Sequence, residues 1–329
     1  MLLAGLFAIL ALSACGVRSQ EAVTKDLDKK LGEIKSYKAN AKMTLQMGTE
    51  PQTYEIEVSH KNPSYYRVNL KNAQKEQSQM ILRNNDGVFV LTPALNKSFR
   101  FQSEWPKNSS QAYLYESLIK DIIEDKEAKF TATKEHYIFE TKTRYQNNQM
   151  FPTQEITLKK SDLTPLSVKV MDTDKNVLVK VEFSTMKFNV NFDKKEFDME
   201  KNLTSAQLEI PVMAELGNDE FSVKYPTESL NIELVDEKEL TTENGKRVIL
   251  TYEGEKSFTL VQERVVVSPV SSLKTVRGNP VDLGFTIGAL SKNSIAWNYQ
   301  GVEYMIASKD LTEEEMVMIA RSVQGGTIK

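Results

Sequence analysis

The chain has 329 residues, with 45 acidic side chains, 42 basic side chains and a formal net charge of −3. This near-neutral mixture excludes the basic stripe by which proteins bind nucleic acids, and it excludes a polybasic membrane patch. Because the chain has a single cysteine, a disulfide framework is excluded too, and the fold depends on burial of apolar side chains.

Residues 2–14 form an apolar run that ends in the sequence LSACG, in which Cys15 is the only cysteine of the chain. As a helix this run extends only about 20 Å, whereas a bilayer core is roughly 30 Å thick, so a transmembrane anchor is disfavoured. Small residues before a cysteine are typical of a secretory signal with a lipobox. We therefore predict a signal peptide at residues 1–14 and acylation of Cys15. The lipid would tether the mature chain to the extracytoplasmic face of the cell membrane.

The next segment predicts a helix followed by a series of strands. Apolar residues in 20–35 are spaced four, four and three positions apart, which is one stripe of a helix. Residues 37–47 then alternate between apolar and polar side chains, which predicts a strand with one buried and one solvated face. Further segments of this kind, separated by short turns, predict an antiparallel meander. These segments are 54–60, 66–70, 80–82, 88–91 and 99–101.

A second helix is predicted after Ser109 or Ser110, either of which is a suitable N-cap, with Leu114, Leu118 and Ile122 on its apolar stripe. A flat open sheet of about eleven strands would leave its edges and its apolar face unprotected. We therefore predict an α+β fold in which the antiparallel meander curls into a half-barrel covered by helices. The later strands are predicted at residue 130 and at 137–143, 156–158, 166–170 and 177–183.

The alternation of apolar and polar residues along the early strands predicts that their inward side chains line an apolar cavity. Ordinary core packing is the alternative role for each of them. Methionines at positions 43, 47, 80 and 150 would adapt to a variable ligand, or they would simply fill gaps. The candidate lining residues are Met43, Leu45, Ile56, Val58, Val68, Leu70, Met80, Leu82, Phe89 and Leu91.

A linker is predicted at 201–217, between a half-barrel domain at 15–200 and a small C-terminal α+β domain at 218–329. Thr312 and Glu315 form a capping box that begins a helix. A lipid-handling fold alone does not need this second domain, so we favour a partner-binding surface over a purely structural appendage. Its strands are predicted at 221–225, 230–235, 248–252, 258–267, 283–287, 294–297 and 304–307.

Two parts of the sequence resemble a known family. The segment NDGVFVLTP at 85–93, followed by Asn96 and residues 97–99, resembles the turn, aromatic strand, proline and return strand of the LolA-like lipoprotein-carrier family. Residues 163–166, followed by 174–176, 181–183, Asn189 and Phe197, resemble the closing strands of that family. With the lipobox and the second domain, the chain is most similar to the YdcC-like sporulation lipoproteins, and in outline it resembles RseB-type sensors. The resemblance implies an incomplete barrel with a helical lid over an apolar cavity, which carriers use to shield the acyl chains of lipoproteins.

Catalysis is poorly supported, because the sequence has no nucleophile elbow, phosphate-binding loop or dinucleotide fingerprint. His60 and His136 both fall in strand patterns without a neighbouring cysteine or a metal-spaced ligand. The three glutamates that begin at Glu313 match the preference for negative charge in a first helical turn better than a cation site. We predict no enzyme activity, no catalytic residue, no metal and no cofactor.

Three classes of function remain open. The first is a membrane-tethered binder, with an acyl chain or lipoprotein in the half-barrel. The second is an envelope or sporulation protein that holds a protein partner. For this class the resemblance implies regulation of a spore-cortex peptidoglycan amidase or an RseB-like envelope sensor. An enzyme is the third and ranks last. We therefore predict a membrane contact through Cys15, a lipid or protein partner, and no nucleic acid.

Overall fold

The computed structural model describes residues 18–46, 51–72, 78–93, 97–101, 103–106, 110–145, 151–193, 195–209, 221–227, 231–242, 245–264, 272–276, 278–283 and 285–323. The signal peptide, Cys15, Met47, Ser109 and Met150 lie outside these residues. The described helices are α1 (Gln20–Glu33), α2 (Tyr115–Glu124), α3 (Met199–Glu209) and α4 (Glu313–Ser322).

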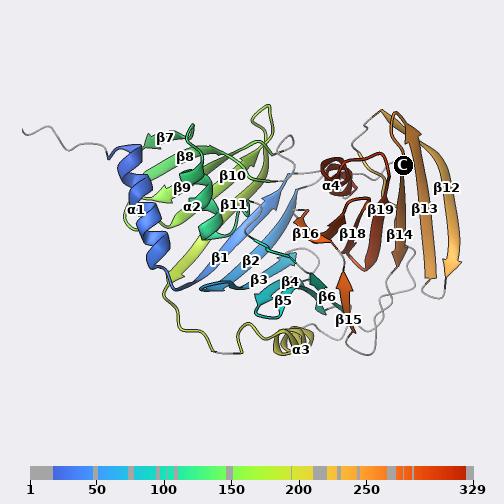
Figure 1. Ribbon diagram of the computed structural model, residues 1–329, viewed down its shortest axis with the longest axis horizontal. Helices are drawn as coiled ribbons and strands as arrows, with labels where there is room; N and C mark the ends of the chain where they lie inside the picture. Colours follow the sequence, from blue (N-terminus) through green and yellow to red (C-terminus); the bar gives the residue numbers. More distant parts are fainter. Residues whose placement is uncertain are drawn as a thin grey trace, which may run out of the picture.

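The larger sheet, sheet A, has 12 strands in the order β15-β6-β5-β4-β3-β2-β1-β11-β10-β9-β8-β7. Neighbouring strands are antiparallel except for β15 and β6, which run parallel. The sheet curves around α1 and α2 (Figure 1). Its strands are β1 (Ser36–Leu45), β2 (Gln52–Lys61), β3 (Tyr65–Asn72), β4 (Ser78–Asn84), β5 (Gly87–Thr92), β6 (Lys97–Phe101), β7 (Lys129–Ala132), β8 (His136–Lys142), β9 (Thr153–Lys159), β10 (Pro165–Met171), β11 (Val177–Phe188) and β15 (Ser272–Val276).

The smaller sheet, sheet B, has 7 antiparallel strands in the order β12-β13-β14-β19-β18-β17-β16. Together, the two sheets and their helices confirm the predicted α+β class, a helix-covered half-barrel followed by a C-terminal sheet and helix. The strands of sheet B are β12 (Ile232–Thr242), β13 (Gly245–Gly254), β14 (Phe258–Arg264), β16 (Asn279–Asp282), β17 (Ile287–Ser291), β18 (Ser294–Tyr299) and β19 (Val302–Ala307).

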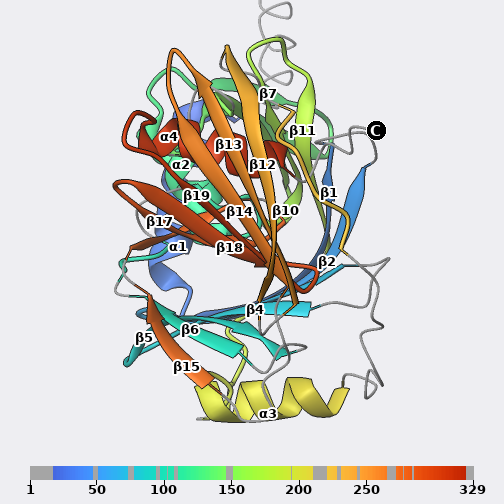
Figure 2. The ribbon, with the colours of Figure 1, turned by 90° about the vertical axis from the view of Figure 1, so that its right-hand side faces the viewer.

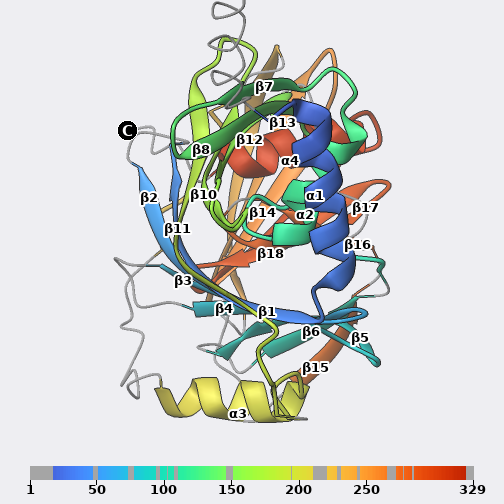
Figure 3. The same cartoon turned by 90° about the vertical axis from the view of Figure 1, so that its left-hand side faces the viewer.

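Helices α1 and α2 cover the concave face of the half-barrel (Figure 3). The Ser19 side chain caps α1 by accepting a hydrogen bond from the Ala22 N–H at 3.3 Å. Val23 and Leu27 of α1 are fully buried, as is Leu118 of α2, and all three belong to the core formed with the strands. The predicted amphipathic stripes therefore face the sheet.

The start of α2 differs from the prediction. Leu114 occupies the N-cap position and makes no side-chain capping hydrogen bond. The hydroxyl of Ser110, a predicted N-cap, instead donates to the buried carboxylate of Asp121 at 2.8 Å. A charged acceptor in a low-dielectric interior forms a stronger hydrogen bond than an exposed helix end, which explains why the serine is used there.

Helix α3 lies against the convex face of sheet A, below β4 and β5 (Figure 2). It includes residues 201–209 of the segment predicted as a linker. Leu203 of α3 is buried, together with Phe197 just before the helix. The half-barrel is thus covered on both faces over part of its width.

Helix α4 lies between sheet B and the half-barrel (Figure 1). Its predicted capping box is confirmed: Thr312 Oγ1 accepts from the Glu315 N–H at 3.2 Å, and Glu315 Oε2 accepts from the Thr312 N–H at 2.8 Å. On its inner side, the Arg321 guanidinium lies 4.4 Å from the centre of the Phe151 ring of the half-barrel segment. The contact between Arg321 and Phe151 joins the two parts of the chain.

Three features of the C-terminal region were not anticipated. The strand predicted at 283–287 is wrong, because β16 ends at Asp282, β17 begins at Ile287, and the Leu283 N–H donates to the Thr286 carbonyl in the turn between them. The strand predicted at 221–225 is wrong, because the Lys224 N–H donates to the Gln262 side chain at 2.9 Å and not to a neighbouring strand. Strand β15, from the C-terminal part of the chain, pairs with β6 and becomes the edge of sheet A. The chain therefore enters sheet B, returns to the half-barrel and enters sheet B again.

Candidate functional site

The ten residues predicted to line the cavity lie on two different faces of sheet A. Six of them, on β1, β2 and β3, are in the core with α1 and α2, and each is at most 5% exposed. The other four, on β4 and β5, form a separate convex cluster with Phe197 and Leu203. The prediction of one shared concave face is wrong for these four. The concave six are Met43, Leu45, Ile56, Val58, Val68 and Leu70, and the convex four are Met80, Leu82, Phe89 and Leu91.

The strand register identifies the concave residues of β4 and β5. Both strands carry apolar side chains on both faces, so alternation does not distinguish inward from outward positions. Val68 pairs with Ile81, Ile81 pairs with Val90, and Val90 pairs with Phe99. Since paired residues of antiparallel strands share a face, Ile81, Val90 and Phe99 lie on the concave side with Val68.

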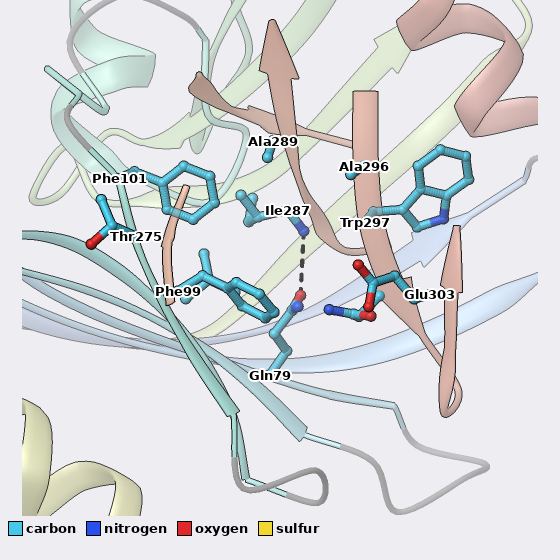
Figure 4. A pocket seen from close by; sticks show the side chains of 11 residues that line it. Gln79, Phe99, Phe101, Thr275, Ile287, Ala289, Ala296, Trp297 and Glu303 are labelled. Carbon is cyan, nitrogen blue, oxygen red and sulfur yellow. Dashed lines mark hydrogen bonds between the residues drawn. The ribbon is translucent and has the colours of Figure 1, made fainter. Parts of the chain in front are cut away.

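A cavity of about 200 Å³ lies on this concave side, where the half-barrel meets sheet B (Figure 4). One wall comes from β4, β5, β6 and β15 of sheet A, and the other comes from β17, β18 and β19 of sheet B. We call it the junction cavity. Its lining residues are Gln79, Val90, Phe99, Phe101, Thr275, Ile287, Ala289, Ala296, Trp297, Asn298 and Glu303.

The junction cavity combines apolar walls with a few polar groups. Phe99 and Phe101 extend toward it from β6 (Figure 4). The Gln79 Oε1 atom accepts hydrogen bonds from Thr286 Oγ1 at 2.9 Å and from the Ile287 N–H at 3.3 Å, which connects the two walls. Asn298 Oδ1 is buried and has no hydrogen-bond partner among the described residues.

The size of the junction cavity limits what it holds. Its volume of about 200 Å³ corresponds to about seven water molecules at roughly 30 Å³ each. Typical small-molecule sites are larger, at roughly 300–1,000 Å³. The cavity therefore fits the end of an acyl chain or one large apolar side chain, and not a whole lipid.

Two tyrosines join the half-barrel to sheet B near this junction. The hydroxyls of Tyr54 and Tyr299 lie 3.1 Å apart, and both donate to Gln52 Oε1, at 2.8 Å and 2.7 Å. Burial raises the pKa of both hydroxyls above the ordinary tyrosine value, so they remain neutral donors at physiological pH.

Removing the Tyr299 hydroxyl is expected to lower the free energy of unfolding by about 0.5–1.5 kcal/mol, because Gln52 loses a buried donor. Denaturant unfolding of Tyr299→Phe, Tyr54→Phe and the double variant tests this. The two single effects should not add, since the hydroxyls share one acceptor. Additive effects would show that the two hydroxyls act independently.

A buried polar network fixes helix α2 to the half-barrel. Asp121 of α2 is 1% exposed and accepts hydrogen bonds from Ser110 Oγ at 2.8 Å, from Gln154 Nε2 at 2.6 Å and from Arg144 Nε. Burial raises the pKa of the Asp121 carboxyl above its ordinary value, although the Arg144 guanidinium acts in the opposite direction. All partners are side chains of the fold itself, which indicates a positioning role and not a reactive carboxylate.

The histidines do not form a catalytic or metal-binding group with their described neighbours. His60 is buried, its ring stacks on Tyr66 at 4.3 Å, and its two nitrogens lie 3.0 Å from the Tyr65 carbonyl and 3.1 Å from Asn62 Oδ1. His136 is half-buried on β8. Within the described part of the chain, no three His, Cys, Asp or Glu residues lie close enough to hold a metal ion.

Comparison with known proteins identifies the family. A family model described as "Sporulation protein YdcC-like" matches residues 1–197. A curated relative, Sporulation protein YdcC of Bacillus subtilis (strain 168), is 56% identical over 330 residues, which cover 100% of this chain and 97% of the relative. The chain belongs to the YdcC-like sporulation protein family. This confirms the resemblance noted in the sequence.

Solved structures give weaker likenesses to this YdcC-like chain. The Pseudomonas aeruginosa MucA/MucB complex matches with a TM-score of 0.33 at 11% identity and covers 92% of this chain and 97% of that one. The structure of the Clostridioides difficile CwlD amidase in complex with the GerS lipoprotein matches with a TM-score of 0.31 at 18% identity. The match covers 54% of this chain and 98% of that one. LolA superfamily protein NE2245 of Nitrosomonas europaea matches with a TM-score of 0.32 at 11% identity, and the match covers 56% of this chain and 100% of that one. At these TM-scores the likenesses carry no argument about binding or activity.

Sequence analysis of this YdcC-like chain missed the lining of the junction cavity. Alternation does not distinguish Val90 from its neighbours Phe89 and Leu91, because all three are apolar. The signal that was available is the continuous apolar run, which indicates a strand buried on both faces. The contribution of β17 and β18 carried no local signal, because it depends on how two distant parts of the chain pack.

Cys15, the predicted lipid attachment site, lies outside the described residues of the YdcC-like chain. Among the residues that the structure describes, no helix has the length and apolar character needed to cross a bilayer.

Proposed function

We propose that this YdcC-like protein is a lipid-anchored, non-enzymatic binding module on the extracytoplasmic face of the membrane during sporulation. The junction cavity is the observation that supports this proposal. It combines apolar walls with a few polar side chains, and strands of two different sheets form it together. Mostly apolar walls with a few polar groups are typical of a ligand-binding site.

The bound group would be part of a larger molecule. The remaining concave face is filled by α1 and α2, and the six predicted concave residues pack in the core. A cavity of about 200 Å³ therefore favours a lipoprotein or another protein that inserts one acyl end or one apolar side chain. This favours a partner-binding protein over a carrier that encloses whole acyl chains.

A photo-crosslinking amino acid at Thr275, an exposed residue at the cavity, tests the proposal in sporulating cells. We expect it to capture a lipid or a protein, which mass spectrometry of the adduct distinguishes. The same crosslinker at exposed Glu182 on β11 is the control. Equal capture at the two positions would contradict binding at the junction cavity.

The Cys15→Ser variant is expected to lose its membrane attachment, because serine offers no thiol for acylation. In cell fractionation the variant should appear in the soluble fraction, whereas the wild-type protein should appear in the membrane fraction. Mass spectrometry of the wild-type N-terminus should show acyl groups. Ser13→Ala keeps a small residue before the cut and should remain anchored. An unmodified Cys15 in membrane fractions would contradict the proposed anchor.

A further inference from the structure

Exposed apolar residues are concentrated on strand β12, at the edge of sheet B. Five large apolar side chains of the described residues are exposed, and three of them belong to this strand. Leu234 is 40% exposed, Val235 is 52% exposed and Leu240 is 45% exposed. Leu234 shares a face of the sheet with Tyr252, and Leu240 shares the opposite face with Arg247, so β12 presents exposed apolar side chains on both faces of the sheet edge.

The backbone of β12 is also available for pairing. The strand has 11 residues and pairs with β13 on one side, and no described strand pairs with its other side. It lies at the end of sheet B far from the half-barrel (Figure 1). Natural edge strands are protected by short length, proline, charged side chains or β-bulges. β12 is long and contains no proline, although it has a register shift between Leu234 and Asp236.

The charge of β12 indicates the chemistry of its partner. The strand carries four acidic residues and one lysine. Glu233 lies directly opposite Glu253 on β13, and no described residue forms an ion pair with either carboxylate. Like charges placed opposite each other destabilise a sheet, so positive charge from a partner would be favourable. A second copy of β12 would instead bring further carboxylates, which disfavours self-pairing.

We propose that β12 binds an extended segment of a partner protein that carries both basic and apolar side chains. The segment adds a strand to sheet B by backbone hydrogen bonding. Its basic side chains approach Glu233 and Glu253 on one face of the sheet, and its apolar side chains cover Leu234 on the other face. This surface is separate from the junction cavity, so the inference stands whether or not that cavity binds a ligand.

The test uses the full chain in detergent and two synthetic octapeptides of equal charge. One alternates lysine with valine, and the other alternates lysine with proline, which cannot form a strand ladder. The lysine–valine peptide is expected to bind about tenfold more tightly and to protect the β12 amides from hydrogen exchange. Equal binding of the two peptides, no binding, or protection elsewhere would overturn the proposal.

Charge variants provide the matched comparison. Glu233→Lys is expected to weaken binding of the lysine–valine peptide about fivefold, because it replaces attraction with repulsion. Glu33→Lys makes the same charge change on the exposed end of α1 and should leave binding unchanged. Equal weakening by both variants would mean that net charge, and not β12, attracts the peptide, and would overturn the proposal.

Discussion

The Asp121→Ala variant is expected to lose about 3–5 kcal/mol of unfolding free energy, because it removes one member of a buried charged pair. The substitution leaves the Arg144 guanidinium without its carboxylate. It also deprives Ser110 and Gln154 of their acceptor. Ser110 lies before α2, Arg144 follows β8 and Gln154 lies on β9, so the loss should loosen the attachment of α2 to the concave face. Denaturant unfolding with a helix-sensitive probe measures the change.

Two further variants test whether the loss of stability comes from the buried network around Asp121. Asp121→Asn keeps one oxygen acceptor and nearly the same volume, so its loss should be smaller than that of alanine. Asp174→Ala removes a carboxylate from an exposed turn and should change the free energy of unfolding by no more than about 0.5 kcal/mol. A loss below about 1 kcal/mol for Asp121→Ala would show that the network contributes little to stability.

The Ala296→Phe variant is expected to reduce occupancy of the junction cavity by about tenfold or more, which corresponds to about 1.4 kcal/mol of binding free energy. Ala296 lines the cavity from β18, opposite Phe99 and Phe101 (Figure 4). A phenyl ring there would fill space that the native protein leaves open. Stability should change by less than about 1.5 kcal/mol, because the ring enters a void and not a packed core. The readout is capture by the crosslinker at Thr275.

The control for this variant is Ala307→Phe, the same substitution on β19 outside the cavity lining. It should retain full capture at Thr275. If Ala296→Phe retains capture while remaining folded, the bound molecule does not enter the junction cavity. If both variants lose capture, the effect comes from sheet B as a whole.

The early strands could be assigned from the sequence because only one of their faces is apolar. Met43, Ile56 and Val68 each alternate with polar neighbours, and each is buried in the predicted concave core. In β4 and β5 the same reasoning failed, because Leu82 and Phe89 are as apolar as the concave residues beside them. Alternation is informative only where one side of the strand faces water.

Asp121 shows a second limit of sequence reasoning. Its position on α2 is compatible with an exposed polar residue, yet it is fully enclosed by donors from other segments. No local pattern distinguishes an exposed aspartate from one whose burial is compensated by distant partners. The position of Ser110 just before α2 predicts a helix cap. In the structure its hydroxyl instead donates to Asp121, 11 residues away, which no local pattern indicates.

The amino-acid sequence by itself determined the amphipathic helix α1, the alternating strands β1 to β3, the capping box at Thr312 and the membership of the YdcC-like family. Each of these depends on residues within one short segment or on overall sequence similarity. Tertiary structure alone decided which face of β4 and β5 is concave, the pairing of β15 with β6, and the junction cavity. Local periodicity shows that a face will be buried, but the identity of the covering segment depends on packing between parts of the chain that are distant in sequence.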